Sequence, residues 1–174
     1  MIVKVLDKPQ VILLREIDRT ETVKAMYSCI GGELVRERRK VEVPPWTPEQ
    51  CDKHIAWQQM ELDKGGALLG AFEADELAGI LVLGNRPVGG DPRTAQLVFL
   101  HVTAKHRRKG AATLLVKEVC KLARMRGKKR LYISATPSES AVCFYESQGA
   151  RPLEKPDPGL YSKEPEDIHM IMEL

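Results

Sequence analysis

The fold is decided by the stretch LVFLHVTAKHRRKGAA, which covers residues 97–112. Residues 97–102 are apolar except for His101, and this pattern predicts a buried strand. A cluster of bases with Gly110 follows, and the apolar spacing beyond it predicts a long amphipathic helix. The first N–H groups of a helix lack an intrahelical partner, and the helix dipole favours negative charge there. The stretch therefore predicts a strand, an anion-binding turn and a helix, in that order.

The turn also resembles a known signature. Arg107-Arg108-Lys109-Gly110-Ala111-Ala112 is similar to the Arg/Gln-x-x-Gly-x-Gly/Ala sequence of the GNAT family of N-acetyltransferases. The resemblance implies that this turn holds the pyrophosphate of acetyl-CoA and that the backbone of the preceding strand pairs with the pantetheine arm. The coenzyme-binding residues that it implies are Leu100, His101, Val102, Arg107, Arg108, Lys109, Gly110, Ala111, Ala112, Thr113, Ser138 and Tyr145.

A second segment, AVCFYESQG at residues 141–149, resembles the Ala-x-x-Phe/Leu-Tyr-x-x-x-Gly sequence of the same family. The resemblance implies that Tyr145 reaches the coenzyme sulfur and is the general acid for the leaving thiolate. The chain departs from the family at two positions. Ser138 stands where many members carry Asn, and Arg108 stands where Gly is frequent.

The general base is left open by the sequence. Attack on a thioester requires an amine that has lost its proton. Histone-acetylating members carry a Glu where this chain has Gln96, which can position a water but cannot take a proton. His101 titrates in a suitable range, but strand alternation places it on the opposite face from Gln96, which favours a structural role. Glu33 is a third candidate, and an amine that arrives deprotonated needs no dedicated base.

These patterns and the resemblance predict an α/β (α+β) protein, with residues 1–174 forming a single acyl-CoA N-acyltransferase domain. The expected fold is GNAT-like and three-layered: a mixed central sheet of about six or seven strands flanked by about four helices, with a splayed parallel pair forming the coenzyme cleft. Residues 33–43 are predicted to be an edge strand or a mobile flap. Strands are predicted at residues 10–17, 67–72, 77–83, 97–102, 130–136 and 168–174, and helices at residues 18–32, 48–64, 111–126 and 138–148.

The composition is that of a soluble globular protein, with 43% hydrophobic and 29% charged residues. No apolar run is long enough to span a membrane, and the first residues lack the layout of a signal peptide. We therefore expect a cytoplasmic protein. Its four cysteines show no C-x-x-C spacing, which favours reduced thiols and predicts no metal site.

Charge is unevenly distributed along the chain. Residues 105–130 hold eleven Lys or Arg and one acid, a net charge of +10, which leaves −7 for the remainder. The basic segment suits the phosphates of coenzyme A, and the acidic remainder suits a cationic amine. We predict an acetyl-CoA-dependent N-acetyltransferase that acts on a primary amine, of a small molecule, by direct attack in a ternary complex. In the family the first helix and the loop after it line the acceptor pocket, so the resemblance implies Tyr27 and Glu33 as acceptor contacts.

Other functions are kept as alternatives. One is a protein or peptide N-acetyltransferase. Another class is a non-catalytic protein that binds acyl-CoA or nucleic acid. We expect neither a nucleic-acid nor a membrane partner, because the basic segment has one nearby aromatic residue, Tyr132, and no recognisable reading motif. A homodimer is compatible with the sequence.

Overall fold

The computed structural model describes residues 1–174, and a seven-stranded mixed sheet forms its centre. Every neighbouring pair is antiparallel except β6–β7, which runs parallel. This architecture confirms the predicted mixed sheet with one parallel pair. Across the sheet the strands are β1 (Ile2–Leu6), β4 (Ala67–Glu73), β5 (Glu76–Leu83), β6 (Thr94–Val102), β7 (Arg130–Ala135), β9 (Ile168–Glu173) and β8 (Arg151–Pro152).

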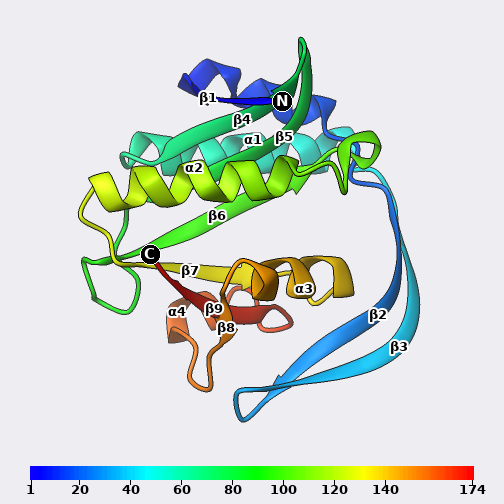
Figure 1. Ribbon diagram of the computed structural model, residues 1–174, viewed down its shortest axis with the longest axis vertical. Coiled ribbons are helices and arrows are strands. Elements are labelled where there is room, and N and C mark those ends of the chain that lie inside the picture. Colours follow the sequence, from blue (N-terminus) through cyan, green and yellow to red (C-terminus); the bar gives the residue numbers. More distant parts are fainter.

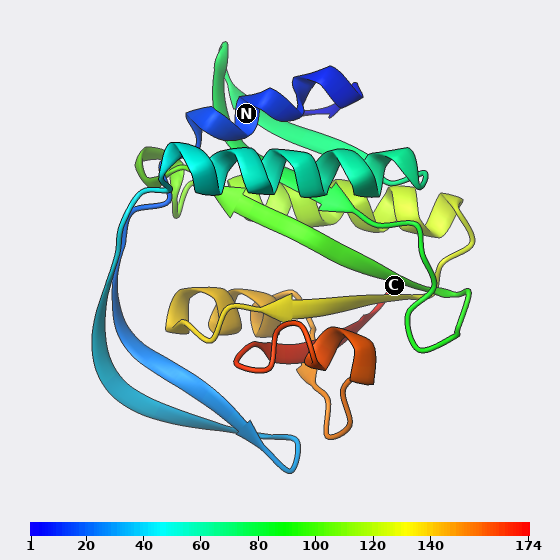
Figure 2. The ribbon, with the colours of Figure 1, turned by 180° about the vertical axis from the view of Figure 1, so that it is seen from behind.

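Helices cover both faces of the sheet, which gives the expected three layers (Figures 1 and 2). One face carries α2 (Ala111–Met125) and α3 (Glu139–Ser147), whose apolar side chains join the larger core cluster. The other face carries α1 (Pro48–Asp63) and the 3₁₀ helix η1 (Lys8–Glu16), around a second cluster. Two short helices, η2 (Ala104–His106) and α4 (Pro158–Tyr161), lie in connecting segments. None of the helices is long and apolar enough to cross a membrane, no group of three or more potential ligands is placed to hold a metal ion, and the four cysteines form no disulfide.

Two predictions for the N-terminal region were wrong. Residues 10–17 form most of η1 rather than a strand, because Val11 and Leu14 are buried at helical spacing. The helix predicted at residues 18–32 is the strand β2 (Glu21–Ile30), which pairs with β3 (Glu33–Val43). Gly31 and Gly32, both with positive φ, form a two-residue hairpin turn where the predicted helix was to end. Strand β1 was not predicted.

We call β2 and β3, residues 21–43, the hairpin arm. It pairs with no strand of the main sheet and curves away from α1 and α2, past α3, towards β8 and α4 (Figures 1 and 2). Its contacts are with the C-terminal half: the Tyr27 amide donates to the Pro137 carbonyl at 2.7 Å, and the Arg36 guanidinium pairs with Glu139 of α3 at 2.6 Å. The arm therefore occupies the place where the prediction had a first helix, and residues 33–43 are confirmed as a strand.

Two features of β6 shape the region beyond its middle. It pairs with β7 only from Thr94 to Leu97, after which the two strands separate. At the same point Val98 is an extra residue in the ladder with β5, a β-bulge. Before the bulge Leu97 packs in the core beneath α2, and after it Phe99 packs in the core beneath α1. The bulge thus changes the phase of alternation, so Gln96 and His101 share a face, contrary to the prediction.

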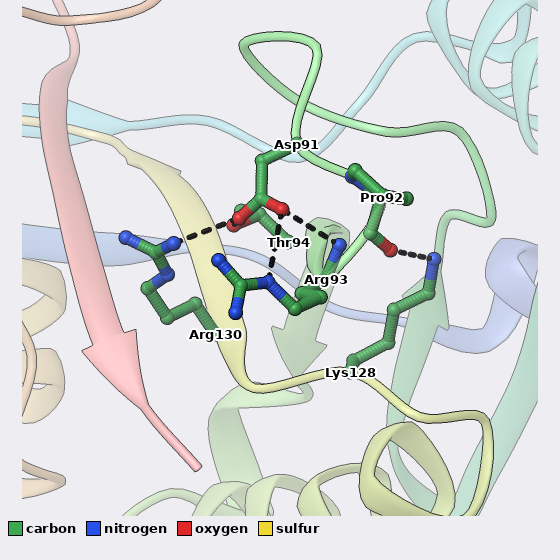
Figure 3. A network of polar contacts seen from close by, with 6 residues as sticks. All are labelled: Asp91, Pro92, Arg93, Thr94, Lys128 and Arg130. Atoms are coloured by element: carbon green, nitrogen blue, oxygen red, sulfur yellow. Dashed lines mark hydrogen bonds and ion pairs between the residues drawn. The ribbon is translucent and has the colours of Figure 1, made fainter.

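The loop that precedes β6 is fastened to the starts of β6 and β7 by one carboxylate (Figure 3). Asp91 accepts hydrogen bonds from the Arg93 amide (3.0 Å) and the Thr94 hydroxyl (2.9 Å), and it pairs with Arg130 at 2.8 Å. The first two hydrogen bonds are the main reason why the pKa of Asp91 is lowered to about 2. Asp91 thereby anchors β6 and β7 at the end where the two strands are still paired.

We expect Asp91→Asn to lower the melting temperature at neutral pH. A carboxyl whose pKa is depressed by folding stabilises the protein above its unfolded value of about 3.9, and this contribution is lost as the pH falls towards the folded value. The difference in melting temperature between the variant and the wild type should therefore shrink between about pH 4 and pH 2. A difference that is constant across this range would contradict the assignment.

Candidate active site

A cleft of about 430 Å³ opens where β6 and β7 separate. Residues of β6, the end of β7 and α3 line it. The Thr103 amide donates to the Ala78 carbonyl of β5, so alternation turns the amides of Leu100 and Val102 to the opposite edge, which faces the cleft. Of the predicted coenzyme residues, those that line the cleft are Leu100, His101, Val102, Arg107, Ala112, Ser138 and Tyr145.

A second cavity of about 550 Å³ adjoins the cleft at the start of α2. The six consecutive amides from Arg108 to Thr113 donate to no acceptor of the protein, since α2 begins at Ala111 and no bond from these amides is formed elsewhere. Arg108 and Gly110 have left-handed backbone conformations, with φ of 59° and 88°. Alternating conformations of this kind form anion-binding concavities, and the helix dipole adds to the effect.

The remaining residues predicted at the turn have different surroundings. Gly110, Ala111, Thr113 and Arg108 line the second cavity. Lys109 lines neither cavity, and its ammonium lies 3.9 Å from the Glu73 carboxylate. Ser138 is the N-cap of α3: its hydroxyl accepts from the Ala141 amide at 3.3 Å, so the position is engaged in holding the helix.

Arg107 lines both cavities but is committed to the protein's own backbone. Its guanidinium donates to the Thr20 carbonyl at 2.7 Å and to the Val102 carbonyl at 3.2 Å, and it lies 3.8 Å from Glu21. It therefore ties the end of β6 to the root of the hairpin arm. The Arg107 side chain forms part of the wall of both cavities, and its guanidinium contributes positive charge to them.

We expect Arg107→Ala to destabilise the protein by about 2 kcal/mol, because it leaves two carbonyls without charge-assisted bonds. Coenzyme affinity should fall in parallel as the wall loosens. Thermal unfolding and calorimetric titration would measure the two effects. A variant that binds coenzyme weakly but melts like the wild type would show that Arg107 acts on the ligand by charge alone.

Tyr145 lies on the face of α3 that borders the cleft and is only 7% exposed. Its ring packs against Phe144 with centroids 5.2 Å apart, and its hydroxyl has no hydrogen-bond partner in the protein. Burial, with a smaller contribution from Asp167, raises the pKa of Tyr145 well above its usual range. The phenol therefore stays protonated at neutral pH, as a proton donor must.

One wall of the cleft is aromatic. Trp46 lies with its ring centroid 4.8 Å from that of His101 and 4.9 Å from that of His54. Arg19 lies above the Trp46 ring at 5.5 Å. The pKa of His101 is lowered to about 3, mainly by burial, and the positive charge of Arg19 also lowers it. His101 is therefore uncharged at neutral pH and a weak base.

The other predicted catalytic and acceptor residues lie away from the cleft. Gln96 does not line it. Glu33 is exposed at the tip of the hairpin arm and borders none of the three main cavities. Tyr27, on β2, has its hydroxyl 3.6 Å from the Cys143 thiol of α3 and borders a third cavity.

Sequence reasoning missed Asp167 and Glu164, which line the cleft from the segment before β9. Burial, followed by the charge of Glu164, raises the pKa of Asp167 to about 6. The only local signal was an acid directly before a predicted strand, at the end of a proline-rich loop. Trp46 and His54, which also line the cleft, were not among the predicted site residues.

Separated parallel strands beside a turn with free amides form a site that suits a long phosphorylated ligand. A family model described as the acetyltransferase (GNAT) family matches residues 32–150. The chain belongs to that family, which confirms the resemblance and the prediction of an acetyltransferase. No protein of curated function is close enough in sequence to be matched.

Solved structures share the fold at low sequence identity. A candidate streptothricin acetyltransferase from Bacillus anthracis, with acetyl coenzyme A bound, has a TM-score of 0.73 at 16% identity over 99% of this chain and 98% of its own. Nourseothricin acetyltransferase has a TM-score of 0.68 at 19% identity over 99% and 97%. A ribosomal-protein-alanine N-acetyltransferase from Brucella melitensis has a TM-score of 0.64 at 15% identity, with both chains covered completely. These similarities confirm the predicted fold class.

Proposed function

We propose that this enzyme transfers the acetyl group of acetyl-CoA to a primary amine of a small molecule, within a ternary complex. The observation that carries the proposal is the junction of two features: a cleft between separated strands, and a turn with six free amides at one end of it. The turn suits the pyrophosphate. The free edge of β6 suits the amide groups of pantetheine, which would place the thioester beside Tyr145.

The residues present can support each step of the transfer. The amine nitrogen attacks the thioester carbon, and the amides of Leu100 and Val102 stand along the edge where a developing oxyanion would lie. The C–S bond then breaks. The hydroxyl of Tyr145 gives its proton to the leaving sulfur, and the phenolate is reprotonated from the nitrogen as the amide forms.

Cavity size and charge support a small acceptor. The third cavity, which meets the cleft at Asp167, has a volume of about 730 Å³, in the range of small-molecule sites. The cleft lining holds three acids, Glu21, Glu164 and Asp167, and two guanidinium groups, Arg19 and Arg107. Glu21 lies beside Arg107, whereas Glu164 and Asp167 form no ion pair and can face a cation. Among proteins of this fold, nourseothricin acetyltransferase is named for a small molecule and the Brucella enzyme for a ribosomal protein, so the fold itself is neutral on this point.

The test begins with calorimetric titration of the protein with acetyl-CoA, with desulfo-coenzyme A and the bare nucleotide as comparison ligands. We expect micromolar or tighter binding that depends on the phosphates. Thiol release is then measured with a panel of small amines and of short peptides with free α- or lysine amines. Release with peptides alone would transfer the proposal to a protein acetyltransferase, and absence of coenzyme binding would refute it.

A further inference from the structure

A third cavity, of about 730 Å³, lies between the hairpin arm and the segment that leads into β9. We call it the hairpin cavity. Residues 26–29 of β2 form one wall, and residues 153–156, Pro158 and residues 165–169 form the other, together with Pro137. Its place follows from the arm, which crosses this end of the molecule (Figure 2).

The hairpin cavity and the cleft share one residue, Asp167. Two short segments border both spaces. At the end of β7, Thr136 and Ser138 border the cleft, while Pro137 borders the hairpin cavity. Before β9, the cleft is bordered by Glu164 and the hairpin cavity by Glu166. Asp167 therefore stands at the junction of the two spaces.

The carboxylate of Asp167 has no partner in the protein. It receives no hydrogen bond and forms no ion pair, although it is half-buried. Its charge reaches Tyr145, since it contributes to the raised pKa of that phenol. A half-buried carboxylate that no protein group engages can pair with the cation or hydrogen-bond donor of a ligand.

We propose that Asp167 receives the acceptor's amine and takes its proton, and that the remainder of the acceptor occupies the hairpin cavity. The inference rests on the proposed function and deepens it. An ammonium group pairs with Asp167 and gives it one proton, which solvent later removes. The neutral nitrogen then attacks the thioester carbon, and its second proton follows the route through Tyr145 to the coenzyme sulfur. One amine and one acetyl thioester thus yield one amide and one thiol.

The cavity also indicates the class of acceptor. Its volume admits a molecule much larger than a simple alkylamine. Its lining has more carboxylates than cations: Glu37, Glu154, Glu166 and Asp167 against Arg39 and Lys155. An elongated amine with a second positive charge fits this lining.

The first test is the pH dependence of kcat/KM for the best amine of the panel. The charged or titratable groups around Asp167 are Glu164 and Glu166 on its own segment, Tyr145 on α3, His169 on β9, Glu37 and Arg39 on β3, and Glu154 and Lys155 on the loop after β8. The wild-type rate should rise through about pH 6, as the carboxyl loses its proton. In Asp167→Asn, kcat/KM should no longer rise through this pH range (the acidic limb of the pH profile), and its value should fall by about 10²-fold or more. Coenzyme affinity should be unchanged.

Two variants serve as matched comparisons. Asp167→Glu should restore part of the rate, and Glu164→Gln should move the limb to lower pH because it removes the neighbouring charge that raises the pKa of Asp167. The assignment would be overturned if Asp167→Asn had the kcat/KM and the pH profile of the wild type. It would also be overturned if the acidic limb of the profile lay at the same pH in Glu164→Gln as in the wild type.

A binding measurement separates this inference from the proposed function. The desulfo-coenzyme A complex is titrated with 1,4-diaminobutane, which requires no turnover. If the panel yields no acetylated amine, the proposed function fails, but loss of diamine binding in Asp167→Asn would still support the role of Asp167. A wild-type complex that does not bind the diamine, or a variant that binds it equally well, would refute that role.

A second pair of variants tests the hairpin cavity. Ser28 lines the cavity and is exposed, whereas Ile30, on the same strand and 67% exposed, lines none of the three cavities. Ser28→Trp should raise KM for the amine by about tenfold, a loss of about 1.4 kcal/mol in binding. Ile30→Trp should leave it unchanged, and neither should alter coenzyme binding. Equal KM values in the two variants would overturn this part of the proposal.

Discussion

Replacing Tyr145 by Phe is expected to lower kcat by about 10²-fold or more, with little change in the dissociation constant of the coenzyme. The substitution keeps the buried ring and its contact with Phe144, and it removes only the hydroxyl. That hydroxyl has no partner in the protein, so its loss leaves no buried group unpaired. Steady-state kinetics and calorimetric titration on the same preparation would measure both quantities.

Tyr132 offers a matched comparison, since it is also a buried tyrosine but lies outside the cleft. Its hydroxyl is hydrogen-bonded to His169 at 2.8 Å and accepts from the Asp157 amide at 3.1 Å. Tyr132→Phe should therefore reduce stability and leave kcat close to that of the wild type. If Tyr145→Phe weakened coenzyme binding and turnover equally, Tyr145 would contribute packing rather than a proton.

Gly110→Glu is expected to weaken coenzyme binding by about 10²-fold or more. It introduces a negative charge among the six free amides, where like charges at a few ångströms cost several kcal/mol at low effective dielectric. The backbone at this position has a φ of 88°, which also disfavours any side chain. Calorimetric titration with acetyl-CoA gives the affinity directly.

Gly110→Ala separates the two causes. A Cβ atom here would meet no other atom within 4 Å, so the only cost is the left-handed conformation, about 1–2 kcal/mol of stability. The alanine variant should melt at a lower temperature and retain most of its coenzyme affinity. If alanine and glutamate weakened binding equally, the shape of the turn would matter and its charge would not.

The elements that the sequence predicted well are those whose local pattern agrees with their tertiary role. The strand, turn and helix across residues 97–126 combine an apolar run, a glycine and a clear helical stripe, and all three formed as expected. The same holds for α1, whose capping box at Thr47 is present in the structure. Each of these signals is contained within one short segment.

The hairpin arm was predicted wrongly because its strands are held by residues that are distant from them in the sequence. Residues 21–30 have apolar side chains at helical as well as strand positions, and pairing with β3 and contact with α3 decided between them. The position of Tyr145 at the cleft was predictable from a local motif, while its role as general acid stays a prediction. The positions of Asp167 and Trp46 were not predictable, since the fold alone brings them to the cleft, and one bulged residue, Val98, reversed the face assigned to His101.

The way the arm is held has a consequence for the order of folding. A two-stranded hairpin is marginally stable by itself. The arm's contact between Tyr27 and Cys143 joins residues 116 positions apart, and the segment around Leu153 comes later still. During synthesis the arm therefore leaves the ribosome long before its supports do, and closing so long a loop makes its docking a late event. If the amine binds in the hairpin cavity as proposed, its site is completed only when the last strand is in place, after the segment that forms the turn for the phosphates has been synthesised.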